Sequence, residues 1–308
     1  MTSSQERKHV VSVSIGSSKR DHSVETDVMG VPFRIERVGT DGDMEKAKQM
    51  IRDYDGKVDA IGLGGIDLYL IIGKKRYTLK DGKKLADCAK ISPTYDGSML
   101  KHTIERGFIM QLAKEGKYLR KGSKVLVISS ADRFGMAEAL FNSGCDVVLG
   151  DLMFTLNLPI PLRTLPALKI VASILVPIVS NVPFELLYPT GKKQEKRTPK
   201  FEDYFRHAEV IAGDFNYINR YMPDDMAGKT IITNTVTASD IEEMKTMGVA
   251  TLITTTPDFG GRSFGTNVME GVYSTILGRN RKNPLTIQDL DEMLKKSDLK
   301  PRILPLNE

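Results

Sequence analysis

The sequence has no tryptophan, two cysteines and four histidines among its 308 residues. Cys88 and Cys145 are too few for a disulfide framework, and neither they nor the histidines show the spacing of a zinc site. No histidine has a Ser/Asp or Cys partner that the sequence identifies, so a hydrolytic triad is not indicated. We therefore expect no metal site and a reducing, cytoplasmic location.

The chain also has no apolar run long enough to span a bilayer. Its most apolar stretch, residues 170–184, is interrupted by Pro177 and Pro183 and falls short of the roughly 20 residues that a spanning helix needs. This pattern is typical of a buried helix or of a helix at a dimer interface. Residues 1–11 lack the charged start and apolar stretch of a signal peptide. We expect no membrane partner, no secretion, and a homo-oligomer.

No nucleic-acid-binding stripe is visible, because the 44 basic residues are interleaved with 39 acidic ones. A hydrophobic share of 41% and a charged share of 27% are typical of an ordinary globular protein with a real core. The chain is longer than the about 250 to 300 residues at which single cores stop growing, so one or two domains are expected. The partner that we expect is a small-molecule substrate.

Residues 1–116 have the pattern of a small α/β domain, which we interpret as the substrate domain. Strands are predicted over 9–16 and 23–39, a helix over 44–54 after an acidic turn, a strand over 57–65 and a hairpin over 68–82.

From residue 117 strands alternate regularly with short helices, which predicts parallel βαβ units. We expect a doubly wound, Rossmann-like nucleotide-binding domain over 117–278 with a Pro-rich helical insertion over 154–205, followed by a C-terminal helix and tail over 279–308. The fold class is therefore α/β. The prolines of the insertion predict broken helices.

A dinucleotide domain needs a tight turn after its first strand, where the pyrophosphate meets a helix N-terminus. Four residues of this turn are candidates for cofactor binding: Ser129, Ala131, Arg133 and Gly135. Ser129 and Ala131 stand where the first two glycines of G-x-G-x-x-G would be, and we expect the neighbouring acid, Asp132, to cap the helix.

Asp151 ends the second strand, about 20 residues after the turn, where an acid can bind the adenosine ribose and favour NAD over NADP. The alternative is an ordinary polar residue at a strand end. Later strand ends are also polar and include Thr235 and Thr255, so we expect one crevice at the carboxyl edge of the sheet.

Candidate substrate-binding residues come from two further segments. The first turn offers hydroxyls and positive charge for an anionic substrate, from Ser17, Ser18 and Lys19, although a plain polar turn explains it as well. A glycine-rich stretch over 259–271 precedes a helix, and there Asn267 is a candidate for holding a substrate.

Residues 94–129 resemble the junction in shikimate and quinate dehydrogenases, where an Asp-Gly, a helix and a basic turn lead into the first strand of the nucleotide domain. The resemblance implies an NAD-dependent oxidoreductase that transfers hydride between nicotinamide and a hydroxylated carboxylic acid. It also implies that Asp96 pairs with a catalytic lysine. Asp67 stands where that lysine is expected, and Lys90 is a candidate by proximity.

Two other functions stay open on the sequence. One is a non-redox protein on the same scaffold that binds a nucleotide or a phosphorylated ligand, or a transferase. The other is an interaction protein whose apolar insertion docks on a partner or a membrane surface.

Overall fold

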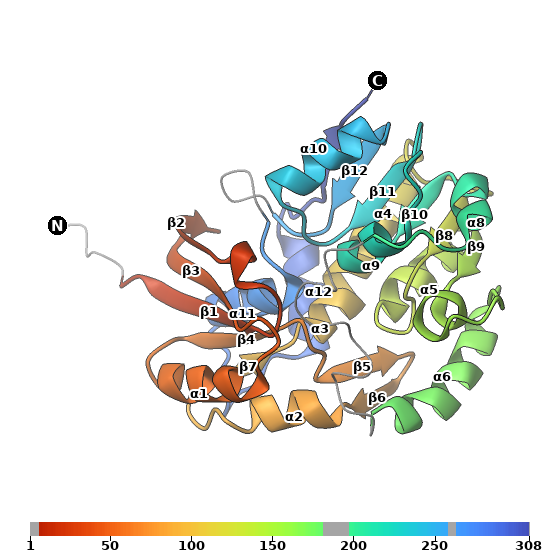
Figure 1. Cartoon of the computed structure of the whole chain (residues 1–308). Helices are drawn as coiled ribbons and strands as arrows, with labels where there is room; N and C mark the ends of the chain where they lie inside the picture. The colour runs from red at the N-terminus through yellow and green to blue at the C-terminus, as the bar shows by residue number, and fades with distance from the viewer. Residues whose placement is uncertain (1–5, 181–196, 258–262, 308) are drawn as a thin grey trace.

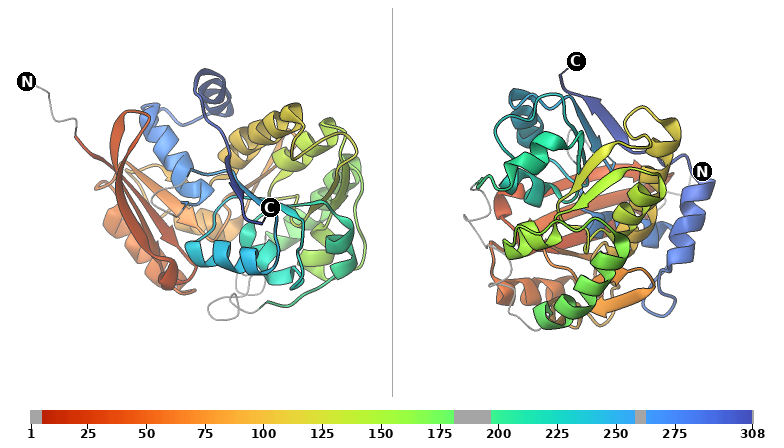
Figure 2. Two further views of the ribbon diagram at one scale, coloured as in Figure 1. Left: turned by 90° about the horizontal axis from the view of Figure 1, so that it is seen from above. Right: turned by 90° about the vertical axis from the view of Figure 1, so that its right-hand side faces the viewer.

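The computed structural model describes residues 6–180, 197–257 and 263–307. Two α/β parts lie side by side: the first is red to orange in Figure 1, and most of the second is green to cyan. The C-terminal segment, in blue, passes behind the first sheet before it reaches the second (Figures 1 and 2). The α/β class and the two-part arrangement that the sequence predicts are thus confirmed.

The first sheet has the order β2-β3-β1-β4-β7 and is parallel except for β2, which pairs antiparallel with β3. The central strands of this sheet are apolar in sequence because both faces of the sheet are covered. The strands are β1 (Lys8–Ser14), β2 (His22–Val28), β3 (Val31–Gly39), β4 (Ala60–Gly64) and β7 (Thr94–Tyr95).

The predicted helix of the first part is confirmed as α1 (Met44–Tyr54), which begins where the side chain of Asp43 accepts the N–H of Lys46. Its apolar face buries Ala47 and Ile51 against the sheet. The predicted hairpin is also confirmed, as β5 (Tyr69–Ile72) and β6 (Lys75–Thr78), and α2 (Lys80–Ala86) follows it.

The second sheet has the order β13-β12-β11-β10-β8-β9, and five of its six strands are parallel. Numbered from its own first strand, the parallel part runs 2-1-3-4-5, an order of doubly wound sheets. The strands are β8 (Lys124–Val127), β9 (Asp146–Leu149), β10 (Val210–Ala212), β11 (Thr230–Thr233), β12 (Thr251–Thr254) and β13 (Arg302–Pro305).

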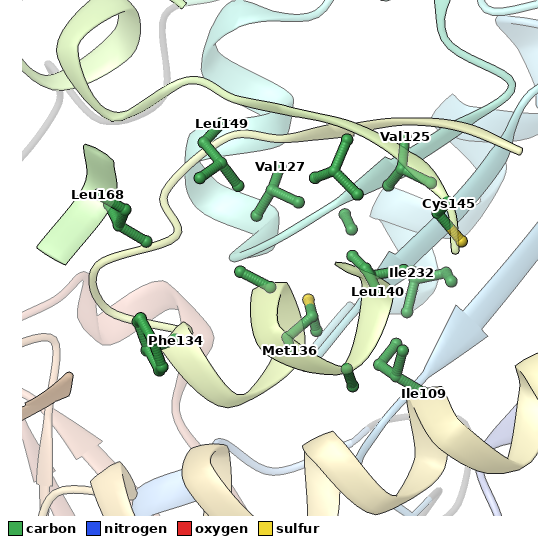
Figure 3. Packing of buried hydrophobic residues seen from close by; sticks show 14 of the residues in the cluster. Ile109, Val125, Val127, Phe134, Met136, Leu140, Cys145, Leu149, Leu168 and Ile232 are labelled. Carbon is green, nitrogen blue, oxygen red and sulfur yellow. The ribbon is translucent and has the colours of Figure 1, made fainter. Parts of the chain in front are cut away.

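Helices cover both faces of this sheet. One face packs on α4 (Arg106–Glu115), α5 (Phe134–Asn142) and α6 (Leu165–Val179). Figure 3 shows this core, in which Phe134, Met136 and Leu140 of α5 lie against Val125 and Val127 of β8. The other face packs on α8 (Glu202–His207), α9 (Phe215–Tyr221) and α10 (Ala238–Thr246).

Three features differ from the sequence pattern. The C-terminal helix predicted within residues 279–308 is present as α12 (Ile287–Lys296), but the tail after it forms β13, a short edge strand flanked by Pro301 that pairs antiparallel with β12. In the Pro-rich insertion, α6 continues through Pro177 for two residues instead of ending before it. Helix α11 (Thr266–Ile276) packs on β1 and β4 of the first sheet, although we assigned its residues to the second domain. The predicted domain boundaries stay predictions.

Candidate ligand-binding cleft

The carboxyl ends of the parallel strands of both sheets open onto one cleft of about 270 Å³. From the first sheet it is lined by Ser14 at the end of β1 and Gly64 at the end of β4. From the second it is lined by Ser129 after β8 and by Asn234 after β11. Ligands of open parallel sheets bind at this edge, so the cleft is the candidate functional site. The predicted crevice of polar strand ends therefore exists as a cavity.

A buried lysine joins the two walls of this cleft. Lys101 begins a π-helical turn, η2 (Lys101–Glu105), between α3 (Ser98–Leu100) and α4. Its Nζ lies 2.8 Å from Oδ1 of Asp67 in the first part and 2.5 Å from Oδ1 of Asp132 in the second. Such π-turns are frequent at functional sites. Asp132 does not cap α5 as we expected, because Lys101 holds its carboxylate instead.

The three charges perturb one another's proton affinity. Burial, together with the charge of Asp132, raises the pKa of Asp67 to about 7, although Lys101 opposes the shift. Burial alone would lower the pKa of Lys101, but the carboxylates of Asp132 and Asp67 outweigh it and raise that pKa. Lys101 therefore stays protonated, and Asp67 is a group that gains or loses a proton near neutral pH.

Asp96, predicted to be catalytic, lines the cleft but uses its carboxylate to hold the backbone. Oδ2 accepts the N–H groups of Leu68 and Tyr69, each at 2.8 Å, and Oδ1 accepts the N–H and hydroxyl of Ser98. These bonds fix the loop that carries Asp67. Asp96 is thus a positioning residue in the geometry observed.

Hydroxyl and amide groups line the first-sheet side of the cleft. The Nδ2 of Asn267 donates to Oγ of Ser12 at 2.7 Å, and Nη2 of Arg37 donates to Oγ of Ser14 at 3.0 Å. The start of α11 can approach because Gly97, with φ +88°, has no Cβ; a Cβ there would lie 2.7 Å from the backbone nitrogen of Asn267.

Aromatic rings line the opposite side. Phe154 lies in the turn after β9, and Tyr217 and Tyr221 lie on α9. The ring centroids of Phe154 and Tyr221 are 5.3 Å apart, and those of Tyr217 and Tyr221 are 6.5 Å apart and stacked. Only Tyr217 of the three is half-exposed. The cleft thus combines a polar side with an aromatic side.

Arg20 lines the cleft and links the first part to the second through its side-chain contacts. Its Nη1 donates to Oδ1 of Asn216 at 2.7 Å, and its Nη2 lies 3.6 Å from Oδ2 of Asp240. The expected substrate residue Ser17 precedes it and lines the cleft. Ser18 and Lys19 are exposed and are not among the residues that line the cavity.

The turn after β8 does not offer the anion site that a dinucleotide needs. Oδ1 of Asp151 accepts the backbone N–H of Ser130 at 3.0 Å and of Ala131 at 2.7 Å, and Oδ2 accepts the hydroxyl of Ser130. These are the N–H groups that a pyrophosphate would have to bind. Asp151 is buried and bonds back into the turn, so it is not available to a ribose.

Three further cofactor candidates serve the packing of the second part. Arg133 is 0% exposed, and its guanidinium pairs with Glu105, also 0% exposed, and reaches Asp214 at 3.2 Å. Thr255 donates to the same Glu105 carboxylate at 2.7 Å. At Gly135 a Cβ would lie 2.9 Å from the carbonyl oxygen of His102, so this glycine permits close packing of α5 on η2.

The remaining candidates divide between the cleft and the surface. Ser129 and Thr235 line the cleft. Lys90 does not: it lies in a separate depression with Arg52 and Cys88, and its backbone N–H donates to Asp55. Asn267 lines the cleft, whereas residues 259–262 of the glycine-rich stretch lie outside the described residues.

The sequence reasoning missed Lys101 and Tyr217 as cleft residues. A usable signal existed for both. Lys101 follows Asp96 by about one and a half helical turns, and Tyr217 lies in the first turn of a helix that starts directly after a strand end. Residues in these positions of a parallel sheet lie near its carboxyl edge.

The fold and the cleft make this chain a two-part α/β protein with a polar cleft between its two sheets. Comparison with family models shows the family to which it belongs. Residues 99–306 match the model described as "Domain of unknown function (DUF8754)", and residues 9–96 match "Domain of unknown function (DUF8753)". The first model spans more than half of the chain, so the chain belongs to the DUF8754 family. No curated protein matches the chain.

Several solved structures are similar over nearly the whole length. An ABC transporter solute-binding protein from Burkholderia multivorans is 14% identical over 97% of this chain and 98% of its own, with a TM-score of 0.36. A galactofuranose-binding protein is 13% identical over 94% and 99%, with a TM-score of 0.34. A periplasmic ribose ABC transporter protein from Conexibacter woesei is 9% identical over 99% and 93%, also with a TM-score of 0.34. Likenesses at these TM-scores define no ligand for this chain.

These comparisons correct the sequence-based interpretation. The resemblance to shikimate and quinate dehydrogenases is contradicted, since neither matching family model carries such a description and Asp151 already holds the N–H groups that a dinucleotide would need. The predicted NAD-dependent oxidoreductase and its NAD cofactor are corrected with it, and the alternative nucleotide- or phospho-ligand-binding protein or transferase is not matched by the comparisons either. The physical reason why NAD does not fit is that Asp151 accepts the backbone N–H groups of Ser130 and Ala131, which a pyrophosphate would need.

The predicted cytoplasmic location finds no support in the comparisons, whose similar structures include a protein described as periplasmic. Among the described helices, none combines the length and the apolar character needed to cross a membrane.

Proposed function

We propose that this protein binds a small polyhydroxylated molecule, of the size and chemistry of a monosaccharide or polyol, in the cleft between the two sheets. The observation that carries the proposal is the pairing of a polar side with an aromatic side in one cavity of about 270 Å³. That volume lies near the lower end of the range of ligand pockets, about 300 to 1,000 Å³.

The polar groups on both walls of the cleft match hydroxyl groups. Asp67 and Asn267 offer oxygen acceptors, and Ser17 and Ser129 offer hydroxyls that both donate and accept. Thr235, expected to bind a cofactor, lines the same cavity and would contact the same ligand. The opposite side supplies the face of Tyr217, on which the C–H groups of a ring can lie.

The pairing of most cations that line the cleft favours an uncharged ligand; Arg220 is the exception among the described residues, since its guanidinium lies over the ring of Tyr221 instead of pairing with a carboxylate. Lys101 is bonded to two carboxylates, Arg37 to Asp21, and Arg133 to Glu105 and Asp214. A cation that is already neutralised gains little from a second anion, whereas a hydroxyl can still donate to the free lone pairs of its carboxylate partner.

A panel of aldoses, ketoses and polyols tests the proposal by thermal shift, followed by calorimetric titration of each hit. A ligand that binds only the folded state raises stability in proportion to the logarithm of its concentration over its Kd. We expect saturable binding of at least one member, weakened about tenfold or more by Tyr217→Ala.

Tyr204→Ala is the matched control, because Tyr204 is a half-buried tyrosine of α8 outside the cleft. Binding should be unchanged in this variant. The proposal fails if no member of the panel binds at millimolar concentration, or if Tyr217→Ala and Tyr204→Ala weaken binding equally.

A further inference from the structure

Helix α6 presents an apolar face to the outside of the molecule. Its inner face buries Leu168, Ala172 and Val176, while Ile170, Ile174 and Ile178 are 61%, 58% and 59% exposed. The helix lies at the periphery of the second part, beside the β5–β6 hairpin (Figure 1). A helix that is apolar on all sides is normally covered on all sides, so the outer face of α6 is a candidate contact surface.

The outer face carries almost no charge. Its exposed positions are Pro166, Lys169, Ile170, Ser173, Ile174, Pro177 and Ile178, with a single ionisable group among them. That group, the ammonium of Lys169, lies 5.4 Å from the ring centroid of Phe134, at the inner edge of the helix. A partner surface must therefore be equally uncharged, since a buried and unpaired charge is costly.

Two occupants fit an uncharged apolar face, a lipid surface and a second protein surface. Surfaces that lie on membranes are enriched in aromatic anchors and in basic side chains. Six of the ten exposed large apolar residues among the described residues fall between 156 and 178, and all six are leucine or isoleucine. This composition favours a protein surface over lipid.

The spacing of the isoleucines favours the same face on a second copy. Residues 170, 174 and 178 follow one another at intervals of four and form a ridge of the kind that interdigitates with an identical ridge at a crossing angle of about −50°. A two-fold dimer places the same patch on both sides of its interface. An uncharged ridge of this spacing on one copy can therefore pack against the same ridge on a second copy.

The available area meets the need of a specific interface. Leu156, Leu158 and Ile160, in the segment that leads into α6, are 38%, 43% and 51% exposed. With the three isoleucines they offer on the order of 500 Å² of apolar surface per copy, so a dimer would bury about 1,000 Å² in total, the lower bound of biological interfaces. The patch on one copy is in the range of the largest apolar patch of a typical monomer, about 300 to 600 Å², and patches of that size are often functional.

We propose that two copies of this chain pair through the outer faces of α6 about a two-fold axis, with Ile174 beside its own counterpart and residues 156–160 at the rim. The pairing is independent of the ligand proposed for the cleft.

Sedimentation velocity and light scattering of the purified full chain test the pairing. We expect the wild type to be a dimer at micromolar concentration and Ile174→Glu to be a monomer, with the dissociation constant raised at least a hundredfold. Ile91→Glu is the matched control, because Ile91 is 69% exposed but lies in the first part, and it should stay dimeric. Unfolding curves of all three proteins verify that each is folded.

Two further measurements make the result decisive. Ile174→Cys in a Cys88→Ser background should form a disulfide-linked dimer under mild oxidation, since the two Ile174 positions adjoin. Flotation with vesicles of phosphatidylcholine and phosphatidylglycerol examines the lipid alternative. A wild type that is monomeric at about 50 µM would overturn the proposal. So would an Ile174→Glu variant that stays dimeric. Binding of the wild type to vesicles that Ile174→Glu abolishes would overturn it as well.

Discussion

Lys101 and Asp132 are joined by a 2.5 Å contact between Nζ and Oδ1, and the same Nζ contacts Asp67 at 2.8 Å. The first contact anchors the π-helical turn to the second sheet, and the second anchors it to the first. One buried cation therefore offsets two carboxylates that would otherwise repel each other across the cleft.

Lys101→Met is expected to destabilise the protein by about 3 to 5 kcal/mol at pH 8, because it leaves two buried carboxylates without a cation. At pH 5.5 the loss should be smaller, since Asp67 is then protonated. Urea unfolding at both pH values measures the difference. Lys83→Met is the control: this lysine pairs with Asp87 but is 58% exposed, so its loss should cost less than about 1 kcal/mol. Equal losses in the two variants would contradict the role assigned to Lys101.

The raised pKa of Asp67, about 7 in the folded protein against 3.8 for an unperturbed aspartate, predicts a specific pH dependence of stability. Between these values the folded state holds a proton that the unfolded state releases, so stability falls as the pH rises from about 4 to about 7. Relative to Asp67→Asn, the wild type should lose about 2 to 4 kcal/mol over that interval. Unfolding free energies of both proteins across pH 4 to 8 measure this. Parallel curves would show that Asp67 has an ordinary pKa.

Asp151 is expected to stabilise the turn after β8 without taking part in ligand binding. Asp151→Ala leaves the N–H groups of Ser130 and Ala131 without their acceptor and should cost about 2 to 3 kcal/mol. Asp151→Asn keeps an oxygen for both N–H groups and should cost less. Asp146→Ala, at the exposed start of β9, is the control and should be near neutral. Thermal and urea unfolding rank the three, and a ranking in which Asp146→Ala costs as much as Asp151→Ala would refute the assignment.

The sequence predicted the elements of the second sheet because each strand there is a short apolar run followed by a helix pattern, for example residues 124–127 before 134–142. It missed β13, since four residues flanked by Pro301 and ending at Pro305 give no periodic signal. It also predicted a crevice of polar strand ends, because the carboxyl ends of parallel strands share one edge of a sheet.

The pairing of charges within that crevice could not be predicted. Lys101 lies 34 positions from Asp67 and 31 from Asp132 in the sequence, and only the packing of the two sheets brings the three together. Likewise, Asp151 stands where an acid could bind a ribose, but its bond to Ser130 depends on the path of the turn, which lacks the glycines that would hold it open for a phosphate.

The ion pair of Arg133 with Glu105 is the most completely buried of the molecule's described pairs, with both side chains 0% exposed. Arg133→Met leaves the carboxylate of Glu105 buried with only the hydroxyl of Thr255 as a donor, so we expect a loss of about 3 to 5 kcal/mol. Glu105→Gln in the Arg133→Met background removes the stranded charge and should recover part of that loss, which gives a coupling energy of about 2 kcal/mol or more in a double-mutant cycle. Arg206→Met is the control, because Arg206 pairs with Asp203 at the surface and is 68% exposed. If Arg133→Met costs no more than this control, or if the two substitutions simply add, the pair does not hold α5 and η2 together in the way that its geometry indicates.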